Sequence, residues 1–173
     1  MKNHEENQQL LHRIRRWVVF IMVGLALSGL TAFPIQIAFE WLLPMIKEAG
    51  PSFPFYKWLL YVAGGVQDTY HHYPFFGYGT DWLAFAHLLL ALVYYGAWVD
   101  PVRNQWLFRF GFVACAGIVP LAFIAGPLRG IPFAWQLIDC SFGVLCFFPL
   151  LRALQLTKRL EKRQPHNFQI ATP

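Results

Sequence analysis

Apolar residues gather in four long runs that short polar segments separate, and this pattern dominates the chain. A helix needs about 20 apolar residues to cross a hydrocarbon core of roughly 30 Å. Each run is long enough to do so, and each therefore predicts a membrane-spanning helix. The expected spans are 17–39, 81–99, 105–125 and 132–154.

These runs end at charged residues or at residues that stop a helix. No charged residue stands between Arg16 and Glu40 in the first run, and Asp100-Pro101 ends the second. Proline lacks the backbone donor that a continuing helix requires. The turn after the second run is expected to be capped, with Asp100 pairing locally with Arg103. The sequence thus predicts an all-α integral membrane protein, a four-transmembrane-helix bundle forming one membrane domain over 1–173, with tails 1–16 and 155–173.

The segment 40–80 has a different character, because it is rich in proline, glycine and aromatic residues. Its apolar run over 55–63 is too short to span a bilayer. Tryptophan and tyrosine rings settle at the depth of lipid headgroups. We therefore expect an aromatic external loop over 40–80 that contains short interfacial or re-entrant helices and covers the outer mouth of the bundle.

The composition excludes other classes of protein. Of the 173 residues, 57% are hydrophobic and only 13% are charged, whereas an ordinary soluble domain carries roughly 25% charged residues. Aromatic residues reach 18%, which excludes a disordered chain. We therefore expect the protein to be embedded in a lipid bilayer.

The distribution of lysine and arginine predicts the orientation, because cytoplasmic loops and tails carry the excess. Only three of the 14 such residues fall on the opposite side: Lys47, Lys57 and Arg129. We expect a cell membrane location, an inner membrane in a bacterium, with both termini cytoplasmic and 40–80 outside. The net charge of +5 arises from residues that flank spans, so no nucleic-acid partner is expected.

His87 and Asp139 are ionisable residues that stand well inside their spans, where such groups are costly and usually functional. His87 lies six residues into the second expected span and Asp139 seven residues into the fourth. At 1.5 Å per residue both depths are about 10 Å. The two side chains are expected to form a hydrogen-bonded pair in the outer half of the bundle, and they are the candidate catalytic residues if the protein is an enzyme.

Other polar and aromatic residues are expected to complete a ligand site around this pair. Gln136 shares a helical face with Asp139, and Tyr94 shares one with His87. Arg129 sits in a tight turn near Asp81 at the outer mouth, and Trp135 lies close by. The expected ligand-binding residues are His87, Asp139, Gln136, Trp135, Arg129, Asp81 and Tyr94.

Haem or metal is not expected. Catalytic zinc takes three protein ligands and a haem between helices generally takes two, yet only His87 stands within a span, and no HExxH spacing occurs. If a metal were bound, the adjacent His71 and His72 would be the candidate ligands.

Four spans in a chain of this length, with acidic and histidine side chains within the membrane, are similar to the layout of the EXPERA group of sterol isomerases and sterol-binding membrane proteins. The chain departs from that group because Asp139 stands alone, whereas the group has paired intramembrane acids. The resemblance covers the architecture and no catalytic motif, and it implies a lipid-like ligand.

Three functions fit these features. The first is a small multi-pass membrane protein whose outward-facing intramembrane polar pocket binds or transforms an amphipathic small molecule or lipid. The second is a structural or accessory subunit of a larger membrane complex. The third is a proton-coupled transporter, which four helices could form only as a homo-oligomer.

Overall fold

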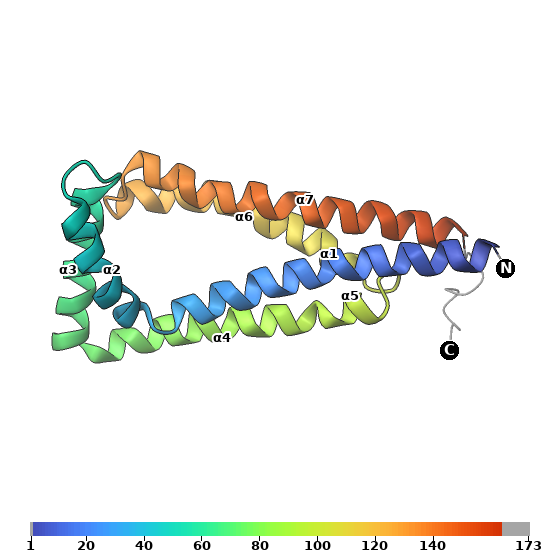
Figure 1. Cartoon of the computed structure of the whole chain (residues 1–173), viewed down its shortest axis with the longest axis horizontal. Coiled ribbons are helices and arrows are strands. Elements are labelled where there is room, and N and C mark those ends of the chain that lie inside the picture. The colour runs from blue at the N-terminus through green and yellow to red at the C-terminus, as the bar shows by residue number, and fades with distance from the viewer. Residues whose placement is uncertain (1, 164–173) are drawn as a thin grey trace. The chain divides into compact units, whose positions relative to one another are not determined.

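A computed structural model describes residues 2–163, and all of its regular elements are helices. Figure 1 labels the elements along the chain. They are α1 (Lys2–Ala32), α2 (Ile35–Ala49), α3 (Tyr56–His72), the 3-10 helix η1 (Pro74–Phe76), α4 (Gly77–Val93), α5 (Tyr95–Val99), α6 (Gln105–Leu128) and α7 (Phe133–Arg163). The predicted all-α class is confirmed for the described residues.

Within residues 2–163, four helical segments are long and apolar enough to cross a membrane, as the sequence predicted. They are His4–Ala32, Pro74–Val99, Gln105–Leu128 and Phe133–Arg163. Large apolar side chains stay exposed along them; Val144 and Leu145 of α7, for example, are 72% and 67% exposed. Such a surface is typical of helices that face lipid rather than water.

The first helix ends seven residues before the expected end of its span at Phe39. Helix α1 stops at Ala32, a turn occupies Phe33 and Pro34, and α2 begins at Ile35. The residue before a proline is disfavoured in the α region, and proline has no amide donor. Hydropathy alone did not reveal this break, because the apolar run continues through it.

The other boundaries also differ from the expected ones. Helix α4 begins at Gly77 rather than Asp81, directly after η1. Helix α7 begins at Phe133 and continues far beyond the expected end of its span at Leu154, to Arg163. The basic segment that was expected to form a tail is thus, up to that residue, the end of a helix.

The chain divides into two compact units, each described here by itself. The central unit is Leu25–Leu90, and the terminal unit comprises the described residues of Met1–Gly24 and Ala91–Pro173.

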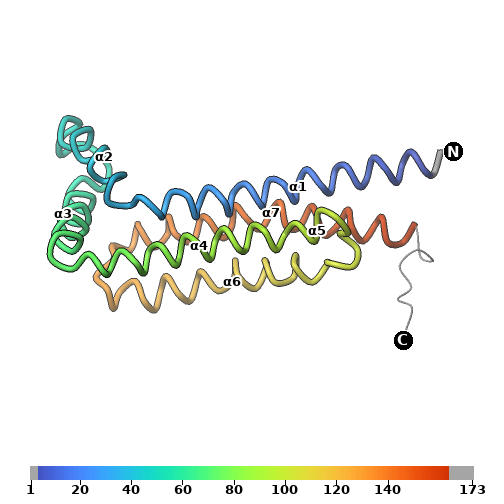
Figure 2. Tube along the Cα trace, turned by 90° about the horizontal axis from the view of Figure 1, so that it is seen from below, coloured from blue at the N-terminus to red at the C-terminus, as the bar shows by residue number. Residues whose placement is uncertain are grey.

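In the central unit, the segment 40–80 contains most of α2, all of α3 and η1, and the start of α4. Helices α2 and α3 have 15 and 17 residues and lie side by side in both views (Figures 1 and 2). At 1.5 Å per residue they measure about 22 and 26 Å, less than a hydrocarbon core. Ile46 and Ala63 are buried, with 1% and 0% exposure. The Tyr70 hydroxyl lies 3.0 Å from Oγ1 of Thr80, which ties α3 to α4.

In the terminal unit, α6 and α7 run side by side (Figure 1). Gly143 of α7 permits their close approach, since a Cβ there would lie 3.0 Å from the Cys115 carbonyl oxygen. At the other end of the unit, Arg15 of α1 donates from Nε to the Trp98 carbonyl oxygen at 3.0 Å. The largest fully buried side chains of this unit come from three helices: Ile14, Val18, Leu107, Phe108 and Thr157.

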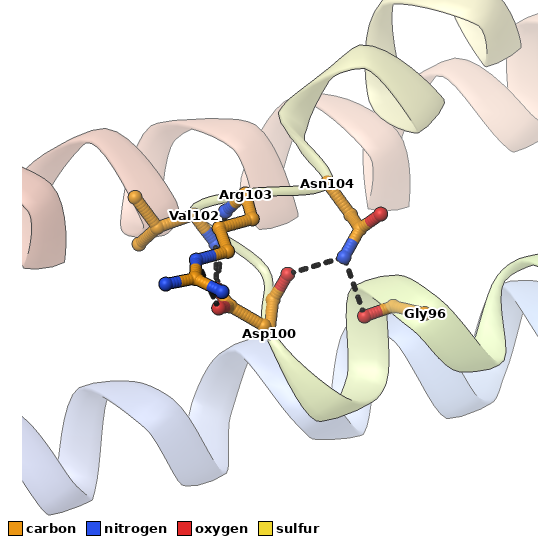
Figure 3. A network of polar contacts seen from close by, with 5 residues as sticks. All are labelled: Gly96, Asp100, Val102, Arg103 and Asn104. Atoms are coloured by element: carbon orange, nitrogen blue, oxygen red, sulfur yellow. Dashed lines mark hydrogen bonds and ion pairs between the residues drawn. The ribbon is translucent and has the colours of Figure 1, made fainter. Parts of the chain in front are cut away.

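The turn between α5 and α6 is closed by its own polar side chains (Figure 3). Oδ1 of Asp100 accepts from the backbone amides of Val102 and Arg103 at 3.2 and 3.0 Å. Nδ2 of Asn104 donates to the carbonyl oxygens of Gly96 and Asp100 at 3.0 and 2.9 Å. Arg103 Nε lies 3.5 Å from Oδ2 of Asp100. The expected capped turn with a local Asp100–Arg103 pair is confirmed.

Candidate functional site

Asp139 is the one charged residue in the first 19 residues of α7, from Phe133 to Leu151. Its side chain is half-buried. Among the described residues of the terminal unit, its carboxyl group makes no hydrogen bond and no ion pair. The Asp139 carboxyl is therefore open to a partner from outside that unit.

The helical face that carries Asp139 turns toward α6. Gln136, one turn before Asp139, is 3% exposed, and Gly143, one turn after it, contacts α6 at Cys115. The predicted inward direction of this face is confirmed at these two flanking positions. Asp139 therefore stands beside the α6–α7 contact.

Gln136 holds the turn between α6 and α7. Its Nε2 donates to the Ile131 carbonyl oxygen at 2.8 Å, and a Cβ at Gly126 would lie 2.7 Å from its Cδ. A tight packing position of this kind leaves the Gln136 side chain little access to a ligand. The exposed Arg129 follows α6 in the same turn, and Trp135 is half-buried near the start of α7.

His87 lies where α1 and α4 meet in the central unit. A Cβ at Gly29 of α1 would stand 3.2 Å from the His87 Cβ. Nδ1 of His87 is 2.7 Å from the Leu83 carbonyl oxygen. A carbonyl oxygen only accepts, so Nδ1 donates the hydrogen of this bond.

The equal depth that the sequence suggested for His87 and Asp139 stays a prediction, and the helix boundaries give only the position of each residue along its own helix. Since α4 begins at Gly77, His87 lies ten residues from its start, about 15 Å at the helical rise. Asp139 lies six residues from the start of α7, about 9 Å. The two residues belong to different units, so their pairing stays a prediction.

Tyr94 makes a buried hydrogen bond in the terminal unit. It follows α4 directly, it is 4% exposed, and its hydroxyl donates to the Leu107 carbonyl oxygen at 3.0 Å. A Cβ at Gly111 would lie 2.6 Å from that hydroxyl oxygen. Tyr94 thus fixes the first turn of α6 within the terminal unit.

The remaining candidates lie in the central unit. Asp81 is half-buried in α4. His71 and His72 end α3, and Nδ1 of His72 lies 3.0 Å from Oδ1 of Asp68. Within residues 2–163, no three histidine, cysteine, aspartate or glutamate side chains gather closely enough to hold a metal ion.

The sequence analysis missed a basic groove between α1 and α7 in the terminal unit. Arg13 and Arg16 of α1 line it together with Arg152 and Arg159 of α7. The arginines themselves were noticed as an orientation signal. Their convergence could have been anticipated only by knowing that α7 continues past Leu154 and which of its faces meets α1.

No protein-family model, no curated protein and no solved structure matches this chain.

Proposed function

We propose that this chain is a multi-pass membrane protein that binds an amphipathic small molecule or lipid, with Asp139 as the main contact for the polar end of the ligand. The observation that carries the proposal is that the Asp139 carboxyl, set in an apolar helix, has no partner among the described residues of its unit. A charged side chain at the centre of a membrane helix costs about 3 kcal/mol or more. A ligand that pairs with the carboxyl offsets that cost.

The surroundings of Asp139 support an amphipathic ligand. Leu137 and Phe142 flank it on α7 and are 48% and 58% exposed, so an apolar body has rings and methyl groups to contact. A carboxylate accepts from a hydroxyl or amine, which makes these the favoured head groups of the ligand.

The orientation belongs to the same proposal. The lysine and arginine bias supports cytoplasmic termini, and α7 would then begin at the outer surface and run inward. Asp139 lies near the start of α7, and the site would open to the outer half of the membrane. The EXPERA-like layout points to a lipid-like ligand as well.

Native mass spectrometry of protein extracted in mild detergent tests the proposal. We expect a retained small molecule on the wild-type chain. Asp139→Asn should lower its retention about 10-fold to 100-fold, as removal of a hydrogen bond to a charged group does. Ser141→Ala is the matched control, since Ser141 is exposed two positions along the same helix and bonds only to the Ile138 carbonyl oxygen.

Two results would contradict the proposal. The first is equal retention by the wild type and Asp139→Asn. The second is a second polypeptide in place of a small molecule, which would identify Asp139 as a contact in a larger complex and favour an accessory subunit or a homo-oligomeric transporter.

A further inference from the structure

The groove between α1 and α7 of the terminal unit has a volume of about 720 Å³. In Figure 1, the first part of α1 (blue) converges with the last part of α7 (red). An ion pair at 2.7 Å between Glu6 and Arg163 holds these two ends together. The groove is thus built by two helices that are joined on its terminal side.

Four guanidinium groups line the groove, from Arg13, Arg16, Arg152 and Arg159. No aspartate or glutamate of the described residues lines it. Arginine stays protonated at any physiological pH, so the four like charges repel one another in the empty groove. An anion with several acceptor oxygens would relieve this repulsion and accept bidentate hydrogen bonds.

The arginines of α1 do not all face this groove. Arg13, Arg16 and Phe20 recur at spacings of three and four and share one helical face. Arg15 turns elsewhere, because it donates to the Trp98 carbonyl oxygen and its guanidinium lies 4.7 Å from the Trp98 ring centroid. Only the face of α1 that carries Arg13 and Arg16 therefore lines the groove.

Aromatic rings form the floor of the groove. Trp17 packs edge-on against Phe148, with ring centroids 5.6 Å apart, and against Phe20 at 6.4 Å. The Arg152 guanidinium lies 5.1 Å from the Phe148 ring centroid. A cation over an aromatic face is attracted by the ring. This attraction holds Arg152 beside the aromatic floor of the groove.

On both helices, the arginines of the groove lie farther from the apolar run than its aromatic residues do. On α1 the arginines at 13 and 16 precede Trp17 and Phe20, which lie toward the apolar run. On α7, Phe148 lies toward the apolar run and the arginines at 152 and 159 lie beyond it. Phe20 and Phe148 are 62% and 49% exposed. A ligand with an anionic head and an apolar tail matches this order.

We propose that this groove binds an anionic phospholipid, with its phosphate between the arginines of α1 and α7 and the start of an acyl chain over Phe20 and Phe148. The volume falls within the roughly 300–1,000 Å³ of ligand pockets. The groove lies at the end of the helices that the lysine and arginine bias predicts to be cytoplasmic, where anionic lipids gather and basic pockets between helices bind their headgroups. The site is independent of the one proposed at Asp139.

The test uses the full chain in nanodiscs that contain phosphatidylcholine and phosphatidylglycerol in equal amounts, and native mass spectrometry counts the lipids released with the protein. The wild type should retain phosphatidylglycerol in preference to phosphatidylcholine. Arg16→Gln/Arg152→Gln, with one change on each helix, should lower that preference at least 10-fold. Lys158→Gln/Lys162→Gln removes two charges from the same end of α7 without touching the groove, and should leave the preference within about 2-fold.

Two further arms complete the experiment. If the Arg16→Gln/Arg152→Gln variant does not fold, Arg159→Gln takes its place, because Arg159 lines the groove and is exposed. Phe20→Ser should weaken phosphatidylglycerol retention without changing the charge of the groove, and millimolar inorganic phosphate should not displace the lipid. Equal loss in the lysine control would show a general charge effect, and displacement by inorganic phosphate would show a site for free phosphate. Either result overturns the proposal.

Discussion

Gly29 of α1 lies directly against the backbone of α4 at Ala84, where a Cβ would stand 2.7 Å from the Ala84 carbonyl oxygen. Ala84 itself is fully buried. Small residues let membrane helices approach until their backbones touch. This contact between α1 and α4 also places His87, whose Cβ borders the same point.

Gly29→Ala is therefore expected to destabilise the chain. An added methyl group at a filled contact costs about 1–3 kcal/mol. The measurement is thermal unfolding in detergent, with an expected decrease of several degrees in Tm. Gly24→Ala on the same helix is the control, since a Cβ there meets nothing within 4 Å. It should keep or raise Tm, and an equal decrease in both variants would contradict the contact.

Asp139 can be changed in two ways that separate function from structure. Asp139→Asn keeps the shape and a hydrogen bond, so folding should be retained while pH-dependent ligand binding is lost. Asp139→Leu removes a costly polar group from an apolar helix, and should keep or raise Tm while it abolishes binding. Thermal unfolding and ligand binding on both variants make the comparison. An unstable Leu variant together with an active Asn variant would assign Asp139 a structural role.

The predicted cooperation of His87 with Asp139 can be measured without knowing their distance. If both contact the head group of one ligand, His87→Gln/Asp139→Asn should lose little more binding than Asp139→Asn alone. The departure from additivity should be about 0.5–3 kcal/mol. His71→Gln combined with Asp139→Asn is the control pair, for which the effects should simply add. Additive effects for both pairs would separate His87 from the site.

The turn between α5 and α6 offers a test of local stability. Asn104→Ala removes two hydrogen bonds to the carbonyl oxygens of Gly96 and Asp100, and should cost about 1–2 kcal/mol. Arg103→Ala removes only an ion pair at 3.5 Å between side chains that are 64% and 30% exposed, and should cost under about 0.5 kcal/mol. Chemical unfolding in detergent compares the two; a larger effect of Arg103→Ala would refute this account of the turn.

The orientation has a direct test by cysteine labelling in a chain whose Cys115, Cys140 and Cys146 are replaced. Ser52→Cys, in the turn between α2 and α3, should react with a membrane-impermeant maleimide added outside intact cells. Lys162→Cys, near the end of α7, should react only after the cells are opened. The reverse pattern would invert the predicted topology.

The sequence by itself determined the number of candidate spans and the nature of one turn. The hydropathy of a span is summed over consecutive residues, so a span can be predicted without knowing which residues are its neighbours in space. The Asp100–Asn104 turn is equally local, because its acceptors and donors lie within eight residues of one another. The end of α1 at Ala32 was missed, because the apolar run continues past Pro34.

The tertiary structure decided which faces of the helices meet. A Cβ at Gly24 would meet nothing within 4 Å, whereas the close contact of α1 with α4 is at Gly29. The hydroxyl of Tyr94 and Nε2 of Gln136 donate to the backbone carbonyl oxygens of Leu107 and Ile131, partners that the sequence did not indicate. Four arginines from distant parts of the chain share one groove. Each of these outcomes depends on the rotation of a helix about its axis and on its partner, and residue spacing along one helix does not specify either.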